Sequence, residues 1–176
     1  PDGSCLTLAG QDQLTYQVLG RQLRLSPESF FQVNLRVAEK LVEYVLDHLP
    51  QTIALNTLEL YAGAGLFSLF LAEHSRELIA IESSPSACFD FANNLDSYDN
   101  VHLYEGPVEQ VLPALMDELP PLDLVLLDPP RAGLHPKARE SLEKLSPEHI
   151  VYISCDPSTL ARDLKHLCVA GYKLED

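Results

Sequence analysis

Cys155 lies in the segment YISCDPSTLARDL, residues 152–164, where a run of β-forming residues gives way to a predicted helix start. Pro157 is favoured at the first position of a helix, and Asp156 is favoured as the cap before it. A helix N-terminus stabilises a thiolate by only ~0.3–1 kcal/mol, and the charge of Asp156 opposes the thiolate. The residue types alone therefore leave Cys155 open between a nucleophile and a buried structural residue.

Asp128 and Arg131 lie in a second segment that could do chemistry, LLDPPRAG, residues 126–133. Its two prolines lack N–H donors and restrict φ, which makes the loop after a predicted strand stiff. A stiff loop can hold the carboxylate and the guanidinium in fixed positions at the edge of a sheet. The alternative is an ordinary turn with a solvated acid.

A glycine-rich turn and an acid suggest a nucleoside site. The segment ELYAGAGLF, residues 59–67, places Gly63 and Gly65 where the backbone can turn tightly and approach a ligand. Glu82 ends the next predicted strand, 17 residues after Gly65, close to the ~20-residue spacing of acids that bind ribose hydroxyls. Ser68 stands where the dinucleotide fingerprint has its third glycine. The combination predicts nucleoside binding. The alternative is an ordinary strand-to-helix turn that contains glycine for its conformation, near an acidic side chain that is only solvated.

The elements that must position these residues alternate along the chain. Strand patterns and helix patterns follow one another five times after Pro50, which predicts an α/β fold with a doubly wound parallel sheet. Ligands bind such sheets at the carboxyl ends of the strands, where the candidate residues fall. The expected strands are residues 57–61, 77–82, 101–105, 122–128 and 149–155, and the expected helices are residues 66–74, 84–95, 108–119, 136–145 and 157–171.

The N-terminal part has a different pattern. Residues 14–34 predict a short β-hairpin around Gly20 followed by a helix start, and residues 34–49 carry apolar side chains at helical spacing. We therefore expect a lead-in segment over residues 1–33 and the α/β domain over residues 34–176.

Composition and charge restrict the possible functions. The 176-residue chain is 46% apolar, but no apolar run approaches the ~20 residues that span a bilayer, and it begins without a leader, so we expect a soluble cytoplasmic protein with no membrane partner. Its four cysteines include no Cys-x-x-Cys pair, so neither a metal site nor a disulfide framework is expected. The 12 basic and 26 acidic residues give a net charge of −14, which alone argues against a nucleic-acid partner.

Four motifs together resemble the RNA uracil-5-methyltransferases: SFFQVN at residues 29–34, ELYAGAGLFSL, LLDPPRAG and YISCDPSTLARDL. The resemblance extends over nearly the whole chain from Ser26. It implies the Rossmann-like fold of methyltransferases that use S-adenosyl-L-methionine, and transfer of a methyl group to C5 of a uridine in ribosomal or transfer RNA. It also implies that a cysteine forms a covalent bond to C6 of the uracil.

The resemblance assigns roles to individual residues. The cofactor-binding positions fall on Gln32, Tyr61, Gly63, Gly65, Glu82 and Asp128. Cys155 falls on the nucleophile, and Arg131 lies where it can meet the substrate. Asp156 replaces the asparagine that often follows this cysteine.

Two features of the family are missing from the sequence. Family members usually begin with a small β-barrel that binds RNA, and some carry an iron–sulfur cluster on N-terminal cysteines. They also carry a general-base glutamate on the last strands of the sheet, and Glu175 comes too early to be that base. We therefore expect truncated final strands, a base beyond Asp176, and RNA contacts mainly through a domain missing from this chain.

Two other functions stay open at this point. A methyltransferase that acts on a protein or a small molecule would suit the acidic surface and would leave Cys155 incidental. A non-catalytic nucleotide-binding module would suit a chain without the base. A 5-methylcytosine enzyme is disfavoured because Pro129, Pro130 and Arg131 follow the fourth predicted strand, where those enzymes pair proline with cysteine.

Overall fold

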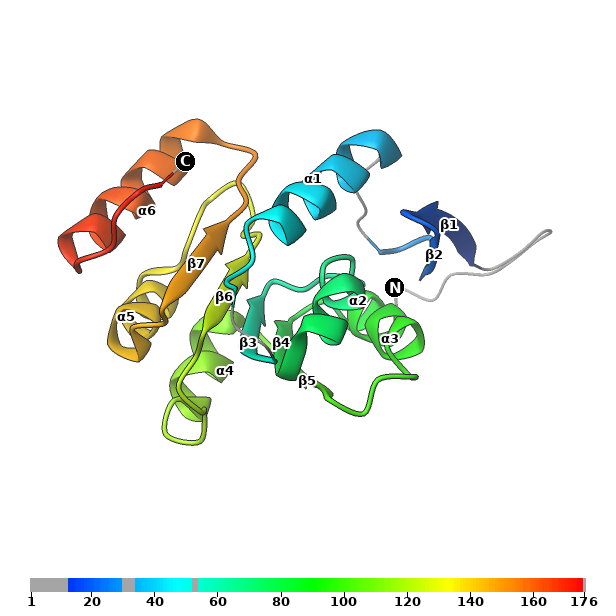
Figure 1. Ribbon diagram of the computed structural model, residues 1–176, viewed down its shortest axis with the longest axis horizontal. Coiled ribbons are helices and arrows are strands. Elements are labelled where there is room, and N and C mark those ends of the chain that lie inside the picture. Colours follow the sequence, from blue (N-terminus) through cyan, green and yellow to red (C-terminus); the bar gives the residue numbers. More distant parts are fainter. Residues whose placement is uncertain (1–12, 30–33, 52–53, 176) are drawn as a thin grey trace, which may run out of the picture.

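The structure is a computed structural model that describes residues 13–29, 34–51 and 54–175. At its centre, five parallel strands form a sheet in the order β5-β4-β3-β6-β7 (Figure 1). These strands are β3 (Leu55–Leu60), β4 (Ser75–Glu82), β5 (Val101–Glu105), β6 (Leu124–Leu127) and β7 (His149–Tyr152). The chain builds outward from β3 through β4 to β5 and then returns to add β6 and β7 on the other side. The predicted doubly wound α/β fold is confirmed, and its switch point lies between β3 and β6.

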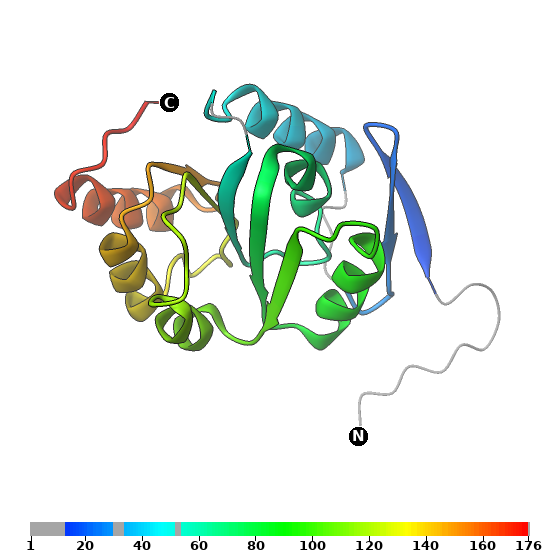
Figure 2. The ribbon, with the colours of Figure 1, turned by 60° about the horizontal axis from the view of Figure 1, so that its bottom comes forward.

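Helices cover both faces of the sheet (Figure 2). Buried side chains of α1, α2 and α3 pack on one face, and those of α4, α5 and α6 pack on the other. The helices are α1 (Leu35–Asp47), α2 (Ser68–Leu71), α3 (Pro85–Asn94), α4 (Val108–Leu115), α5 (Pro136–Leu145) and α6 (Pro157–Val169), and α2 continues as the 3₁₀ turn η1 (Ala72–His74).

Strand β6 shows how the sheet separates two apolar clusters. Leu124 and Leu126 belong to the cluster under α1–α3, whereas Val125 and Leu127 belong to the cluster under α4–α6. Successive side chains of a strand point to opposite faces, so a strand buried on both faces needs an unbroken apolar run. All four side chains of β6 are buried.

The N-terminal part forms the predicted hairpin. Strands β1 (Leu14–Val18) and β2 (Arg21–Leu25) pair antiparallel. The turn between them places Leu19 at φ 45° and Gly20 at φ 81°. Two consecutive residues with positive φ suit a two-residue hairpin turn, because the twist of such a turn matches that of the strands. The predicted hairpin around Gly20 is therefore confirmed.

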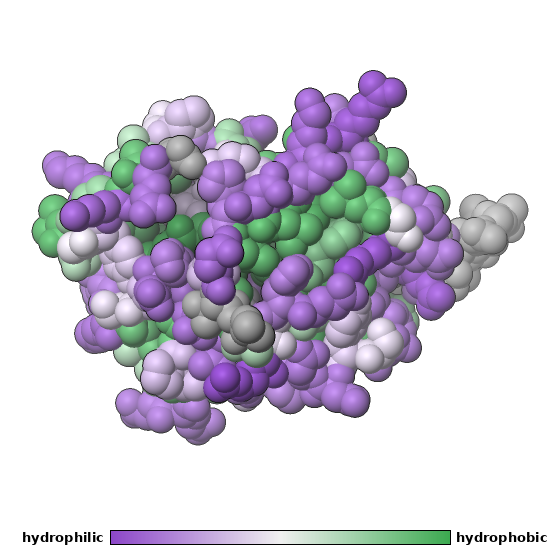
Figure 3. Space-filling model, viewed as in Figure 1, coloured by the Kyte–Doolittle hydropathy of each residue, from purple (hydrophilic) through white to green (hydrophobic). Residues whose placement is uncertain are grey.

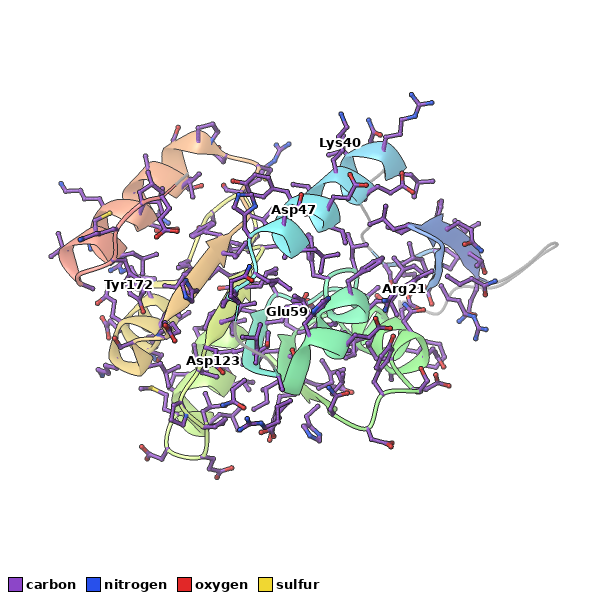
Figure 4. The ribbon with its side chains drawn as sticks, in the orientation of Figure 1. Arg21, Lys40, Asp47, Glu59, Asp123 and Tyr172 are labelled. Atoms are coloured by element: carbon purple, nitrogen blue, oxygen red, sulfur yellow. The ribbon has the colours of Figure 1, made fainter. Side chains whose placement is uncertain are left out.

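Side-chain hydrogen bonds attach the hairpin to α2 and α3. Arg21, labelled in Figure 4, donates to the carbonyl oxygen of Leu69 at 2.5 Å and pairs with Glu73 at 2.7 Å. Asn94 bonds the backbone of Arg24 in both directions, accepting from its N–H at 2.8 Å and donating to its C=O at 2.9 Å. The hairpin therefore packs beside the end of α3.

Two helices, α2 and α4, are much shorter than predicted. The helix expected over residues 66–74 is a single α-turn, because the N–H of Phe70 and the N–H of Leu71 both bond the C=O of Phe67, which mixes 3₁₀ and α bonding. Helix α4 stops at Leu115, and the ring of Pro113 lies inside it. Proline removes a backbone donor and crowds the preceding turn, so an early end is expected.

The surface is mostly polar on the face shown in Figure 3, where an apolar strip runs alongside α1. Side chains of α1 that are only half-buried, such as Leu41 and Leu46, pack against the cluster under α1–α3. Among the helices that the structure describes, none combines the length and apolar character of a membrane span.

Candidate functional site

The candidate residues gather at one edge of the sheet. Because the strands are parallel, their carboxyl ends lie at the same edge. The register pairs at this edge are Leu60 with Ile81, Leu60 with Leu127, and Leu127 with Tyr152. The candidates directly after these positions are Tyr61, Glu82, Asp128 and, three residues after β7, Cys155.

Glu82 holds the glycine turn through its carboxylate. Its Oε2 accepts the N–H of Gly63 at 2.8 Å. Its Oε1 accepts the N–H groups of Ser83 and Ser84, each at 2.7 Å. The structure therefore brings the predicted acid and the predicted glycine turn together, at the end of β4 and the end of β3.

The two glycines of the turn serve different purposes. Gly63 has φ +57°, and no atom lies within 4 Å of the place where a Cβ would be, so its backbone is open to a ligand. Gly65 has φ +87°, and a Cβ there would lie 2.6 Å from Leu95 Cδ2 and 3.0 Å from Phe91 Cδ2. Gly65 is therefore needed for close packing of the turn on α3.

Glu59 was missed by sequence analysis. Its side chain, labelled in Figure 4, is buried at the centre of the molecule, and the Ser68 hydroxyl donates to its Oε2. Its Oε1 is also buried and has no hydrogen-bond partner among the described residues. Burial raises the pKa of the carboxyl group to about 8. The hydrogen bond from Ser68 lowers this pKa in part, and the charges of Asp128 and Glu82 raise it further. The available signal in the sequence was an acidic residue inside an apolar strand. Ser68, at the position of the third glycine, supplies a hydroxyl donor to Glu59 that glycine would lack.

Asp128 is half-buried at the start of the loop after β6. Burial raises the pKa of its carboxyl group to about 6. Its N–H donates to the C=O of Leu60 at 3.4 Å, and Pro129, which follows, has no N–H with which to continue the ladder. Strand β6 accordingly ends one residue earlier than predicted, and Arg131 lies exposed farther along the loop.

Cys155 is exposed on the turn between β7 and α6. The predicted cap is confirmed, because Asp156 accepts the N–H groups of Ser158 at 2.8 Å and Thr159 at 3.1 Å. The bonds from Thr159 and Ser158 lower the pKa of Asp156, and the nearby charge of Arg131 lowers it further. The charge of Arg131, on the loop after β6, therefore acts on the residue that follows Cys155.

The other described cysteines lie elsewhere in the fold. Cys88 is buried in α3, and burial, followed by the charges of Glu105 and Glu82, raises the pKa of its thiol to about 11. Cys168 is exposed near the end of α6, far along the helix from its N-terminus. Among the described cysteines, Cys155 alone is exposed at the carboxyl edge of the sheet, since Cys88, whose thiol donates to the C=O of Glu82 at 3.4 Å, is buried.

Tyr61 turns toward the α4–α6 side of the sheet. Its φ of 62° is left-handed, and its ring packs against the apolar cluster on that side. The ring lines a hollow of about 330 Å³ that also includes Arg162 and Leu134. Burial, with a smaller contribution from the charge of Glu109, raises the pKa of its hydroxyl to about 12. Its assignment to the cofactor stays a prediction.

Gln32 lies outside the described residues, and the nearest described contacts before it in the chain are those of Ser26 and Ser29 with Asp90. The fully buried carboxylate of Asp90 in α3 accepts the N–H of Ser26 at 2.7 Å and the Ser26 hydroxyl at 2.6 Å. It also accepts the Ser29 hydroxyl at 2.5 Å. Asp90 therefore attaches the first residues of the SFFQVN region to the helix that follows Glu82.

The arrangement combines a carboxylate at the end of β4, an open backbone turn, a buried acid and an accessible thiol. Across residues 13–29, 34–51 and 54–175, no group of three or more His, Cys, Asp or Glu side chains could hold a metal ion. The chemistry that these side chains can supply is nucleoside binding beside nucleophilic attack by sulfur.

Sequence comparisons relate the chain to RNA methyltransferases. A family profile described as tRNA (uracil-5-)-methyltransferase matches residues 10–173. An RNA methyltransferase of Lactobacillus johnsonii, itself described as uncharacterized, is 36% identical over 161 residues, which are 90% of this chain and 35% of the relative. One from Synechocystis sp. is 40% identical over 173 residues, which are 95% of this chain and 36% of that protein. The chain thus spans little more than a third of the length of these relatives.

Solved structures show the same fold. The tRNA (uracil-54, C5)-methyltransferase of Pyrococcus abyssi, in complex with S-adenosyl-L-homocysteine, aligns with a TM-score of 0.77 and 29% identity over 90% of this chain and 38% of that one. A precorrin-6y C5,15-methyltransferase of Geobacter metallireducens aligns with a TM-score of 0.67 and 20% identity over 86% of this chain and 78% of that one. The second likeness concerns the fold alone.

Proposed function

The chain belongs to the tRNA (uracil-5-)-methyltransferase family, and on this premise we propose that it is the catalytic domain of an S-adenosyl-L-methionine-dependent enzyme that methylates C5 of a uridine in RNA. The observation that carries the proposal is the meeting of two half-sites at one sheet edge. Glu82 and the Gly63 turn form the first, beside β3 and β4. Cys155 and Asp128 form the second, beside β6 and β7.

The first half-site fits the nucleoside part of S-adenosyl-L-methionine. A carboxylate has about four lone-pair sites, and Glu82 uses three of them for backbone N–H groups, so it can still accept a ribose hydroxyl. The open space beside Gly63 lets a ligand approach the backbone, and the buried Oε1 of Glu59 has no hydrogen-bond partner in the part of the chain that the structure describes. When bound, the cofactor supplies a methyl group on a sulfonium.

Cys155 supplies the step that uracil cannot achieve unaided, because C5 of uracil is a poor nucleophile. The thiolate forms a bond to C6, and the C5=C6 electron pair shifts toward the C4 carbonyl, so that C5 becomes nucleophilic. After C5 has taken the methyl group, a base removes the C5 proton. The C5=C6 double bond then re-forms and the S–C6 bond breaks, which returns the thiolate.

We assign the base and most RNA contacts to parts of the full-length protein outside this chain. Two facts support this: the chain spans little more than a third of its relatives, and its net charge of −14 repels phosphates. Arg131, exposed on the loop after β6, is the cation that we assign to the substrate on this chain. The uridine must leave its stack to reach the thiol, which is easiest from a loop. The proposed location is the cytoplasm.

Covalent capture tests this proposal. The full-length protein is incubated with the cofactor and with ribosomal or transfer RNA that contains 5-fluorouridine, whose C5 fluorine cannot leave as a proton does. We expect a protein–RNA adduct that survives denaturing electrophoresis, disappears in Cys155→Ala and persists in Cys168→Ala. The RNA that gives the adduct identifies the substrate class.

The acidic charge favours one second candidate, a methyltransferase that acts on a protein or a small molecule. This enzyme would transfer methyl groups without forming an adduct. Methyl transfer to RNA that proceeds unchanged in Cys155→Ala would refute the covalent mechanism.

A further inference from the structure

A buried aspartate outside the two half-sites bonds three elements of the active edge. Asp163 lies in α6 and is fully buried. Its Oδ2 accepts the N–H of Leu134 at 2.8 Å and the hydroxyl of Tyr152 at 2.8 Å. Its Oδ1 pairs with the guanidinium of Arg162 at 2.9 Å. One carboxylate therefore holds the far end of the loop after β6, the end of β7 and α6 itself.

The loop after β6 approaches α6 so closely that only glycine fits at the contact. A Cβ on Gly133 would overlap the Asp163 carboxylate and lie 2.5 Å from Arg162 Nη2. Gly133 also has φ +76°, a conformation that residues with a side chain rarely adopt. Arg162 adds a bond to the C=O of Ala132 at 2.9 Å. The loop therefore cannot shift along α6 without breaking the bonds at Asp163.

These elements carry the reactive groups of the second half-site. The loop that ends at Leu134 carries Asp128 and Arg131, and α6 begins at the turn that carries Cys155. Building on the function proposed above, we propose that Asp163 is a positioning residue that fixes Asp128 and Arg131 relative to Cys155.

The carboxylate of Asp163 is suited to positioning the loop and β7 rather than to adding stability. A buried ion pair often adds no net stability over well-packed apolar residues of the same volume. Hydrogen bonds are directional, however, so each bond to Asp163 restricts where the loop and β7 can lie. Burial, and then the bond to Asp163, raise the pKa of Tyr152, so its hydroxyl keeps its proton and remains a donor.

The rate of adduct formation tests positioning separately from binding. In the full-length protein, Asp163→Asn keeps the shape of the side chain but removes the charge and one acceptor oxygen. With 5-fluorouridine RNA at saturation, we expect the adduct rate to fall ~100-fold, as for a misplacement of about 1 Å. The Kd values for RNA and S-adenosyl-L-homocysteine, to which Arg131 and Asp128 are assigned, should change far less than the adduct rate. Tyr152→Phe removes one donor to Asp163, and its adduct rate should fall less than that of Asp163→Asn.

A matched control separates positioning from a general loss of stability. Asp123, labelled in Figure 4, accepts the N–H of Asn56 at 2.7 Å just before β6, at the opposite end of that strand. Asp123→Asn should leave the adduct rate unchanged, and thermal melting establishes that each variant is folded. If Asp163→Asn does not fold, Tyr152→Phe carries the test.

The outcomes are distinct. The inference would be overturned, and the proposed function left standing, if the folded Asp163→Asn protein formed the adduct at the wild-type rate. If only Tyr152→Phe is folded, the same outcome applies to that variant. Parallel loss of RNA affinity and adduct rate would also overturn it, because the effect would then be one of binding. No adduct in the wild type would refute the proposed function, and the inference with it.

Discussion

Replacement of Glu82 by glutamine tests the cofactor half-site most directly. Glu82 accepts three backbone bonds, from Gly63 at 2.8 Å and from Ser83 and Ser84 at 2.7 Å each. Glutamine has one acceptor oxygen, so its NH₂ group must face at least one of these donors or turn away from the site. The change removes a charge and an acceptor while the side-chain volume stays nearly the same.

The expected loss of affinity follows from these contacts. A hydrogen bond to a charged group contributes ~1.5–3 kcal/mol, and about 1.4 kcal/mol corresponds to tenfold in Kd. Glu82→Gln should therefore weaken the binding of S-adenosyl-L-homocysteine by about 10- to 150-fold. Isothermal titration calorimetry of this chain measures the ratio of the two Kd values, and the measurement does not depend on turnover.

Glu105 offers the matched control for this experiment. It is the register partner of Glu82 at the ends of β4 and β5, and it is exposed. Glu105→Gln should change the Kd by less than about twofold, because an exposed charge contributes little through solvent. Equal affinity of folded Glu82→Gln and the wild type would refute the assignment of Glu82 to the cofactor.

Three further outcomes are expected. The pKa of Glu59 is raised from 4.5 to about 8, so the folded state keeps a proton that the unfolded chain releases, and this group makes stability fall as pH rises between these values. The urea midpoint of Glu59→Gln should therefore depend less on pH than that of the wild type, and equal slopes would contradict the buried protonated acid. Gly65→Ala, whose Cβ would lie 2.6 Å from Leu95, should lower the free energy of unfolding more than Gly20→Ala. In Gly20→Ala the new Cβ meets no atom, so the only cost is that of the left-handed backbone, about 1–2 kcal/mol. Equal losses in urea titrations would count against the packing argument. This chain alone should bind S-adenosyl-L-homocysteine yet transfer no tritiated methyl group to RNA, and multiple turnover would place the base within it.

The fold was predictable from the sequence wherever a local residue pattern is compatible with only one kind of structural element. The unbroken apolar run of β6 suits only an element buried on both faces, and Gly20 between two alternating runs suits only a hairpin. The spacing of Gly65 and Glu82 predicted nucleoside binding, which stays a prediction, whereas the bond from the Gly63 N–H to Glu82 had no signal in the sequence. The length of α2 was not predictable, because its mixed bonding depends on how the turn packs on α3.

The contacts that organise the candidate site join residues far apart in the chain. Asp90 bonds Ser26, and Asp163 bonds Leu134, and neither pairing has a local signature. Such bonds become visible only when the fold brings two helices against two loops. The role of Cys155 as the nucleophile stays a prediction, carried by its place on the sheet edge.

The division of the core by the sheet has a genetic consequence. Ala62 and Ala64 of the glycine turn belong to the cluster under α1–α3, whereas Leu134, at the end of the loop after β6, belongs to the cluster under α4–α6. Temperature-sensitive alleles in the core should therefore sort into two phenotypic classes. Lesions of the first face beside the glycine turn should cost cofactor affinity, whereas lesions of the second face beside Leu134 should chiefly slow turnover. A double mutant with one lesion on each face should show both defects, close to their sum, since distant sites act almost independently.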